Sequence, residues 1–218
     1  MPLEEPGEWR SENEWPLARQ EDRSLFLGNS RLDESAAETN ACDEFPYHAS
    51  SGVASGIHWG GGIMPWGMPL DQRHDNANRI AYTSAPLEED LEVTGTPIAK
   101  LFVSSTAHVA YFRVKLIDVA PDGTEKLVRY GGLNATHRQS DVQPTPLEPG
   151  EIYALDIPLK TMSYVFERGH RLQVNIAGAD FQNAWPVAEP GVHSIHRGGD
   201  HASHIVLPMQ PHQSRILH

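Results

Sequence analysis

The chain has 218 residues, of which 39% are hydrophobic and 8% aromatic, which is enough for the core of one large domain. Lys and Arg total 17 and Asp and Glu total 29, so the net charge of -12 excludes nucleic acid as an expected partner. The only cysteine, Cys42, excludes an intrachain disulfide, and the adjacent Asp43 and Glu44 disfavour its thiolate.

The sequence predicts neither a leader peptide nor a membrane span. The N-terminal residues 1–9 are acidic and contain proline, and they lack the basic and apolar regions of a signal peptide. No window approaches the roughly 18 apolar residues that a spanning helix requires. We therefore expect a cytoplasmic protein with no membrane partner.

Residues 1–78 show little regular periodicity. They contain Gly- and Ser-rich turns at 49–56 and 60–62, yet every tryptophan except Trp185 lies among them. A disordered tail would not normally hold so many aromatic side chains. We therefore expect an ordered but irregular segment that wraps around a sheet.

Residues 79–210 change to a pattern of short strands. Within residues 111–116 the apolar side chains of Phe112, Val114 and Leu116 alternate with the basic side chains of Arg113 and Lys115. Such alternation is typical of a strand with two different faces.

A turn follows this strand at Pro121-Asp122-Gly123, because proline sets the first turn φ and glycine accepts a positive φ. Residues 126–130 are its expected hairpin partner. Further strands are predicted where apolar residues alternate or cluster between Pro- and Gly-rich connections, at residues 91–94, 98–103, 152–157, 171–176 and 204–207. Short strands without a long helical period predict an all-β fold, an antiparallel two-sheet sandwich with its core in residues 79–210.

No nucleophile elbow is present. An α/β-hydrolase requires Gly-x-Ser-x-Gly between a strand and a helix, and no serine here has that spacing. The run His58-Trp59-Gly60-Gly61-Gly62 is similar to glycine-rich oxyanion loops, but without a nucleophile a flexible turn is the favoured interpretation. We therefore expect no catalytic residue in this chain and no activity of the chain alone.

Four histidines gather near Asp200, and such a cluster is a candidate transition-metal site. Their spacing matches neither His-Glu-x-x-His nor His-x-His, so surface and turn histidines are the favoured interpretation and no metal or cofactor is expected. The four are His193, His196, His201 and His204.

Residues 63–68 are apolar, partly unbranched and bounded by glycine and proline. By themselves they fit a core plug, an interface patch or the lining of an adaptable pocket. This segment is the main candidate for a binding function.

Short landmarks follow one another along nearly the whole chain. Together they resemble the C-terminal β-domain of the X-Pro dipeptidyl-peptidase and cocaine-esterase family of serine hydrolases. The landmarks include Trp15-Pro16, Leu25-Phe26-Leu27-Gly28, Asp71-Gln72-Arg73, Tyr82-Thr83-Ser84-Ala85-Pro86-Leu87, Gly169-His170-Arg171-Leu172 and Ser203-His204-Ile205-Val206-Leu207-Pro208.

The resemblance implies a galactose-binding-type jelly roll over residues 1–218 that packs on an α/β-hydrolase catalytic domain, in the same polypeptide or a separate chain. It implies that the Ser-Asp-His triad lies outside this chain, and that the domain helps to form the oligomer, with a homo-oligomer as one expected state. It also implies that a loop within residues 57–73 lines the substrate pocket through Ile63, Met64, Trp66 and Met68. One departure is Val109-Ala110-Tyr111, where family members often carry Asp-Thr-Asp.

Two other functions compete with that of a non-catalytic hydrolase domain. A free-standing carbohydrate-binding module would use exposed aromatic side chains, for which Trp59, Trp66 and Trp185 are candidates. A metal-dependent enzyme would use the histidine cluster.

Overall fold

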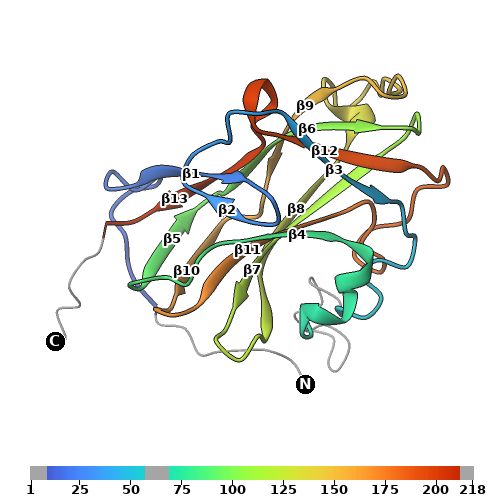
Figure 1. Cartoon of the computed structure of the whole chain (residues 1–218). Coiled ribbons are helices and arrows are strands. Elements are labelled where there is room, and N and C mark those ends of the chain that lie inside the picture. Colours follow the sequence, from blue (N-terminus) through green and yellow to red (C-terminus); the bar gives the residue numbers. More distant parts are fainter. Residues whose placement is uncertain (1–8, 57–68, 212–218) are drawn as a thin grey trace, which may run out of the picture.

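The computed structural model describes residues 9–56 and 69–211 as two antiparallel β-sheets (Figure 1). The larger sheet has the spatial order β10 (Met162–Phe166), β5 (Leu91–Gly95), β13 (His204–Met209), β6 (Ile98–Ser105), β12 (Val192–Arg197) and β3 (Ala41–Pro46), with β1 (Glu21–Leu27), β2 (Leu32–Asp33) and β9 (Tyr153–Pro158) attached beside this path. The smaller sheet has the order β4 (Ile80–Thr83), β11 (Arg171–Ala177), β7 (Tyr111–Val119) and β8 (Glu125–Asn134). The short 3-10 helices are η1 (Gln72–Asn78), η2 (Ala135–His137) and η3 (Gly199–His201).

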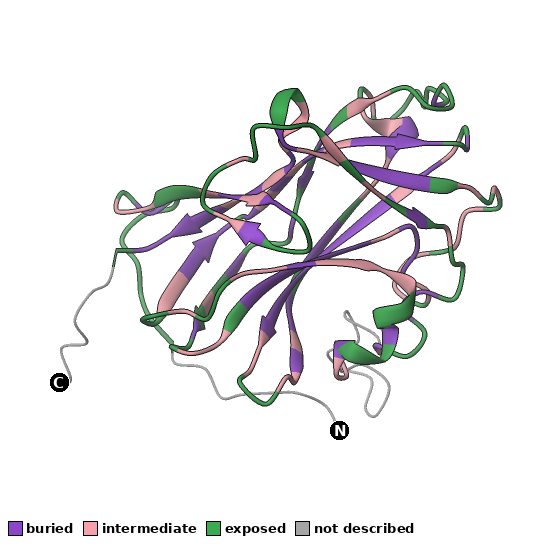
Figure 2. Ribbon diagram, in the orientation of Figure 1, coloured by how far each residue is buried: buried purple, intermediate pink, exposed green. Residues whose placement is uncertain are grey.

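One hydrophobic core joins the two sheets, and Figure 2 shows its buried residues along the strands. The smaller sheet contributes Phe112 and Val174, and the larger sheet contributes Leu101, Ile195 and Leu207, all at most 1% exposed. Burying such a side chain stabilises the fold by about 1.5–3 kcal/mol before entropy costs are counted. The all-β prediction is therefore confirmed.

The strands predicted from alternation are all present, and most extend a few residues further than expected. β7 and β8 pair as the predicted hairpin, with a register shift after Leu116. In the turn between them Gly123 has a φ of 83°, and its N–H donates to the carbonyl oxygen of Ala120 at 2.8 Å. The turn residues therefore act as predicted.

The N-terminal segment is more regular than expected. β1 pairs with β13, and β3 pairs with β12. In β3 only Phe45 is buried, and in β1 only Leu25 and Leu27 are. With so few apolar positions, neither strand shows the period-two pattern that identifies a strand in sequence. The expectation of an irregular segment over residues 1–78 is wrong for these strands.

No helix among the described residues is long and apolar enough to span a membrane. The 3-10 helix η1 lies beside the smaller sheet near β4 and contacts β8 (Figure 1).

Candidate functional site: a polar network on the outer face of the smaller sheet

The face of β7 that points away from the core carries the basic side chains predicted by alternation. Both are nearly buried, since Arg113 is 8% and Lys115 is 9% exposed. On the neighbouring strand β11, Asn175 is the register partner of Lys115 and is 2% exposed. Buried polar groups on a sheet face require hydrogen-bonding partners from another layer.

That layer comes from η1 and from the segments at 50–56 and 179–184. Asp71 caps η1 by accepting a hydrogen bond from the backbone N–H of Arg73 at 3.1 Å. Gln72 and Asp75 are the buried residues of the helix. The 179–184 segment lies far along the chain from the other two, and residues of all three meet over this sheet.

Asp180 provides the counter-charge for both basic residues of β7. Its Oδ2 accepts from Arg113 Nε at 3.0 Å, and its Oδ1 lies 2.9 Å from Lys115 Nζ. Lys115 Nζ also donates to Gln72 Oε1 at 3.3 Å. Burial lowers the pKa of Lys115, and the nearby Asp180 carboxylate opposes that shift.

Gly52 brings the 50–56 segment close to this carboxylate. Its φ is +94°, and a Cβ atom at this position would lie 2.5 Å from Asp180 Oδ1 and 2.7 Å from the carbonyl oxygen of Phe181. A side chain is therefore excluded here by both the backbone conformation and the available space.

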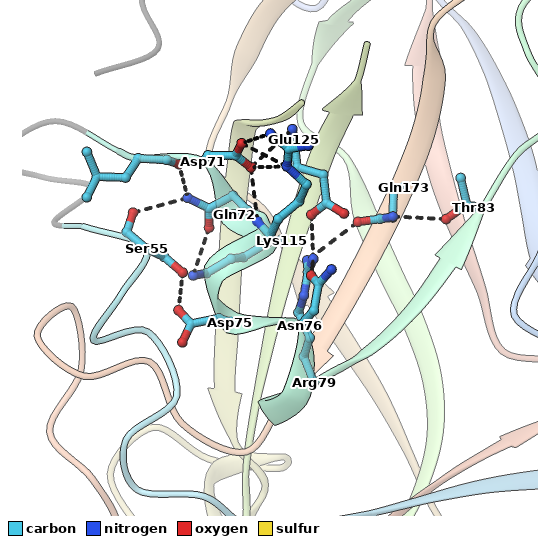
Figure 3. Close-up of polar contacts among 12 residues, drawn as sticks. Ser55, Asp71, Gln72, Asp75, Asn76, Arg79, Thr83, Lys115, Glu125 and Gln173 are labelled. Atoms are coloured by element: carbon cyan, nitrogen blue, oxygen red, sulfur yellow. Dashed lines mark hydrogen bonds and ion pairs between the residues drawn. The ribbon is translucent and has the colours of Figure 1, made fainter. Parts of the chain in front are cut away.

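A second set of contacts joins η1 to the 50–56 segment, as Figure 3 shows. Asp75 Oδ2 accepts from the backbone N–H of Gly52 at 3.1 Å and also from the Ser55 hydroxyl. Gln72 Nε2 donates to the carbonyl oxygens of Ser55 at 3.1 Å and of Leu70 at 2.7 Å. Gln72 thus ties together the residues on either side of the 57–68 segment.

The network continues toward the edge of the sheet through Arg79. Its guanidinium pairs with Glu125 on β8, and both side chains are less than 10% exposed. Arg79 Nη1 also makes a long contact of 3.5 Å with Gln173 Oε1, and Gln173 Nε2 donates to Thr83 at 3.0 Å (Figure 3).

Among the described residues, the contacts of this network hold three segments of the chain together. The charged side chains that meet over this sheet are Arg79, Arg113, Lys115, Asp75, Asp180 and Glu125, with the Asp71–Arg73 pair at the start of η1. The hydroxyls of Ser51 and Ser55 are bonded to the Asn78 carbonyl oxygen and to Asp75. Neither serine lies beside an imidazole that would act as its base. Among the described residues, the network therefore fits a structural role.

An apolar surface adjoins the network directly. Trp185 is 89% and Val53 is 50% exposed, and the rings of Trp185 and Phe181 lie 6.3 Å apart. The backbone N–H of Phe181 donates to the carbonyl oxygen of Ser51 at 2.8 Å, which brings the two segments together. We call the three apolar residues Val53, Phe181 and Trp185 the aromatic patch, after the rings of the last two.

The pocket residues predicted from the family resemblance, Ile63, Met64, Trp66 and Met68, lie outside the described residues, as does the glycine run at 60–62. The network residues that flank them are described, and no motif in the sequence predicts that these residues meet. One feature of the sequence does indicate the network. Arg113 and Lys115 lie at alternate positions of β7, and these basic side chains need a carboxylate partner if another segment covers their face of the sheet.

The histidines of the C-terminal cluster have separate partners. His193 is fully buried, with Nδ1 2.9 Å from Ser105 Oγ, while His196 Nε2 lies 2.8 Å from Ser104 Oγ. His204 Nδ1 bonds to the Ala202 carbonyl oxygen. Among the described residues, no group of three or more His, Cys, Asp or Glu side chains could hold a metal.

The interpretation of His193 as a surface or turn residue is wrong. It lies on β12, which is paired on one side with β3 and on the other with β6, and its ring packs against Phe45, Tyr47 and Phe112. Burial lowers its pKa to about 4.

Comparison with known families gives a match over residues 3–217 to the X-Pro dipeptidyl-peptidase C-terminal non-catalytic domain. The chain is 34% identical over 231 residues to cocaine esterase of Rhodococcus sp. (strain MB1 Bresler), an alignment that covers 93% of this chain and 40% of the esterase.

Solved structures show the same fold. An aminopeptidase from a marine sediment archaeon, Thaumarchaeota archaeon, superposes with a TM-score of 0.80 at 21% identity, covering 94% of this chain and 39% of that chain. A CocE/NonD family hydrolase from Staphylococcus aureus superposes with a TM-score of 0.73 at 18% identity, with the same coverages of 94% and 39%. This chain thus spans about two fifths of the length of each of these proteins.

Proposed function

Because this chain belongs to the family of X-Pro dipeptidyl-peptidase C-terminal non-catalytic domains, we propose that it is the accessory domain of an α/β-hydrolase-type serine hydrolase. The observation that carries this proposal is the alignment with only 40% of cocaine esterase, a protein with ample further length for a catalytic domain. The proposed reaction of the complete enzyme is hydrolysis of an ester, an amide or an X-Pro dipeptide. The proposed fold of the domain is a galactose-binding-type jelly roll.

The partner in this proposal is the hydrolase domain, and the aromatic patch is the surface that contacts it. Trp185 exposes 89% of its surface to solvent in the described structure, although large aromatic side chains usually bury most of theirs. Tryptophans in such positions are enriched at protein interfaces.

The same contact would let the domain shape the substrate pocket through Ile63, Met64, Trp66 and Met68. Two described features favour this role. Ser55 and Leu70, which flank that segment, are joined by a backbone hydrogen bond of 2.9 Å, and both lie on the side of the smaller sheet that carries η1. The aromatic patch begins two residues before Ser55, at Val53.

Labelling with a fluorophosphonate tests the non-catalytic role. The chain alone is expected to form no adduct by intact mass and to turn over neither a p-nitrophenyl ester nor an X-Pro anilide. An upstream or separate hydrolase domain of the same protein is the positive control. Stoichiometric labelling of this chain would overturn the proposal, and Ser104, which is bonded to His196, would be the first site to map.

Carbohydrate binding remains the competing function because Trp185 presents an exposed ring. A glycan array distinguishes the two functions. Specific binding that Trp185→Ala abolishes would favour the carbohydrate module, whereas the accessory-domain proposal predicts no retained glycan.

A further inference from the structure

A small, partly open cavity lies within the polar network, between η1, the 50–56 segment and the outer face of β7 and β11. The space open to the centre of a water molecule is about 20 Å³. Its lining includes Ser51, Asp75, Arg79, Lys115 and Asn175.

Polar atoms of the lining lack partners in the described structure. Both polar side-chain atoms of Asn175, Nδ2 and Oδ1, are buried and make no hydrogen bond. Arg79 Nε is likewise buried and makes no hydrogen bond. Buried amide groups in proteins nearly always find a partner.

The charges around the cavity limit what that partner can be. Arg79, Arg113 and Lys115 are balanced by Asp75, Asp180 and Glu125, of which Asp180 and Glu125 make direct ion pairs. The three basic groups and Asp75 line the cavity, whereas Asp180 and Glu125 lie behind the lining as ion-pair partners of the basic groups. The six charges cancel, so an added ion of either sign would bring an uncompensated charge into this site. A neutral molecule therefore fits the cavity better than an ion.

Size and hydrogen-bonding capacity narrow the choice further. A volume of about 20 Å³ is enough for one or two water molecules, because one water needs roughly 10–15 Å³ by this measure. The partner must accept from Asn175 Nδ2 and Arg79 Nε and donate to Asn175 Oδ1. Water does both.

We propose that this cavity is a hydration site of the polar network, in which one or two ordered water molecules bond to the buried atoms of Asn175 and Arg79. These waters complete the polar network, because they link the side chain of Asn175 on β11 to the layer formed by η1 and the 50–56 segment. The inference concerns this chain alone and is independent of the proposed hydrolase partner.

A crystal structure of the 218-residue chain at about 1.5 Å or better tests the site directly. The expected result is ordered solvent within hydrogen-bonding distance of Asn175 Nδ2, Asn175 Oδ1 or both. An empty cavity, or a protein group bonded to the Asn175 amide, would overturn the proposal.

Oxygen-17 magnetic relaxation dispersion, which counts long-lived internal waters, provides the second measurement. Asn175→Leu, which removes the polar atoms and fills space, is expected to lose one or two such waters relative to the unmodified chain. Arg171→Leu is the control on the same strand, because Arg171 is exposed, donates to the Ser84 carbonyl oxygen and lies outside the cavity lining. An unchanged water count in Asn175→Leu would contradict the proposal, and if that variant fails to fold, the crystal structure of the unmodified chain decides.

Discussion

Asp180 is the residue on which the charges of the outer face of β7 depend. Among the described residues it pairs with both Arg113 and Lys115, and its side chain is 1% exposed. Removing one member of a buried ion pair leaves an uncompensated charge in a poorly solvated environment, which costs more than the pair itself contributes.

We therefore predict that Asp180→Ala lowers the free energy of unfolding by about 3–5 kcal/mol, measured by urea denaturation. Asp156→Ala is the matched control, because Asp156 pairs with Lys100 at 2.6 Å on the exposed surface. That control is expected to cost about 0–1 kcal/mol. An equal loss of unfolding free energy in the two variants would show that Asp180 does not form a buried ion pair with Arg113 and Lys115.

A second prediction for a single residue concerns His193 and the pH dependence of the stability of the fold. Its pKa falls from the ordinary 6.5 to about 4 in the folded chain, so the unfolded chain binds more protons between these values. Burial of the neutral His193 ring contributes fully to the free energy of unfolding above pH 6.5. This contribution is lost as the pH falls toward 4, by roughly 3 kcal/mol in all.

Urea denaturation from pH 7 to pH 4 measures this loss. His193→Phe is expected to have a flatter stability profile in that window than the unmodified chain, whereas His74→Phe, at an exposed position of η1, is expected to keep the original slope. Parallel profiles for the unmodified chain and His193→Phe would refute the assignment.

At the scale of elements, Gln72 attaches η1 to β7 and to the 50–56 segment. The helix is short and has little stability of its own, but its buried Gln72 bonds to two backbone carbonyl oxygens and to Lys115. These bonds attach the helix to β7 and hold Ser55 next to Leu70.

Gln72→Leu is expected to loosen this attachment at a cost of about 1–3 kcal/mol, because two carbonyl groups and the Lys115 ammonium lose a buried partner. Hydrogen exchange at the Leu70 amide, which donates to the Ser55 carbonyl oxygen, should become faster. His74→Leu, on the exposed side of the same helix, should leave that amide protected. Unchanged protection in Gln72→Leu would show that other contacts hold the two residues together.

At the scale of the whole molecule, the aromatic patch is the expected docking surface for a hydrolase domain. Trp185→Ala is predicted to weaken the affinity of the chain for its hydrolase domain about 30-fold or more, since truncating a central interface tryptophan costs about 2 kcal/mol or more. Titration calorimetry with the separately produced domain measures this change.

Val142→Ala provides the control, because Val142 is 87% exposed in the loop after η2 and should leave the affinity unchanged. The unfolding midpoint of the isolated chain should be the same in both variants, which separates docking from folding. An affinity loss no greater for Trp185→Ala than for Val142→Ala would place the contact elsewhere.

The sequence by itself determined the strands that alternate clearly, the β7–β8 hairpin and the family. Alternation in β7 depends on residues two apart, and the hairpin turn depends on a local glycine, so both are visible in a short window. The landmark order along the chain was likewise readable without coordinates. The pocket residues Ile63, Met64, Trp66 and Met68 stay a prediction.

Only the tertiary structure decided what covers the polar face of β7. Arg113 and Asp180 are 67 residues apart in sequence, and Lys115 and Gln72 are 43 apart. A strand sequence shows that it has a basic face, but it does not show whether water or another segment meets that face. The strands β1 and β3 likewise depend on residues far along the chain, because they pair with β13 and β12 and bury few apolar side chains of their own.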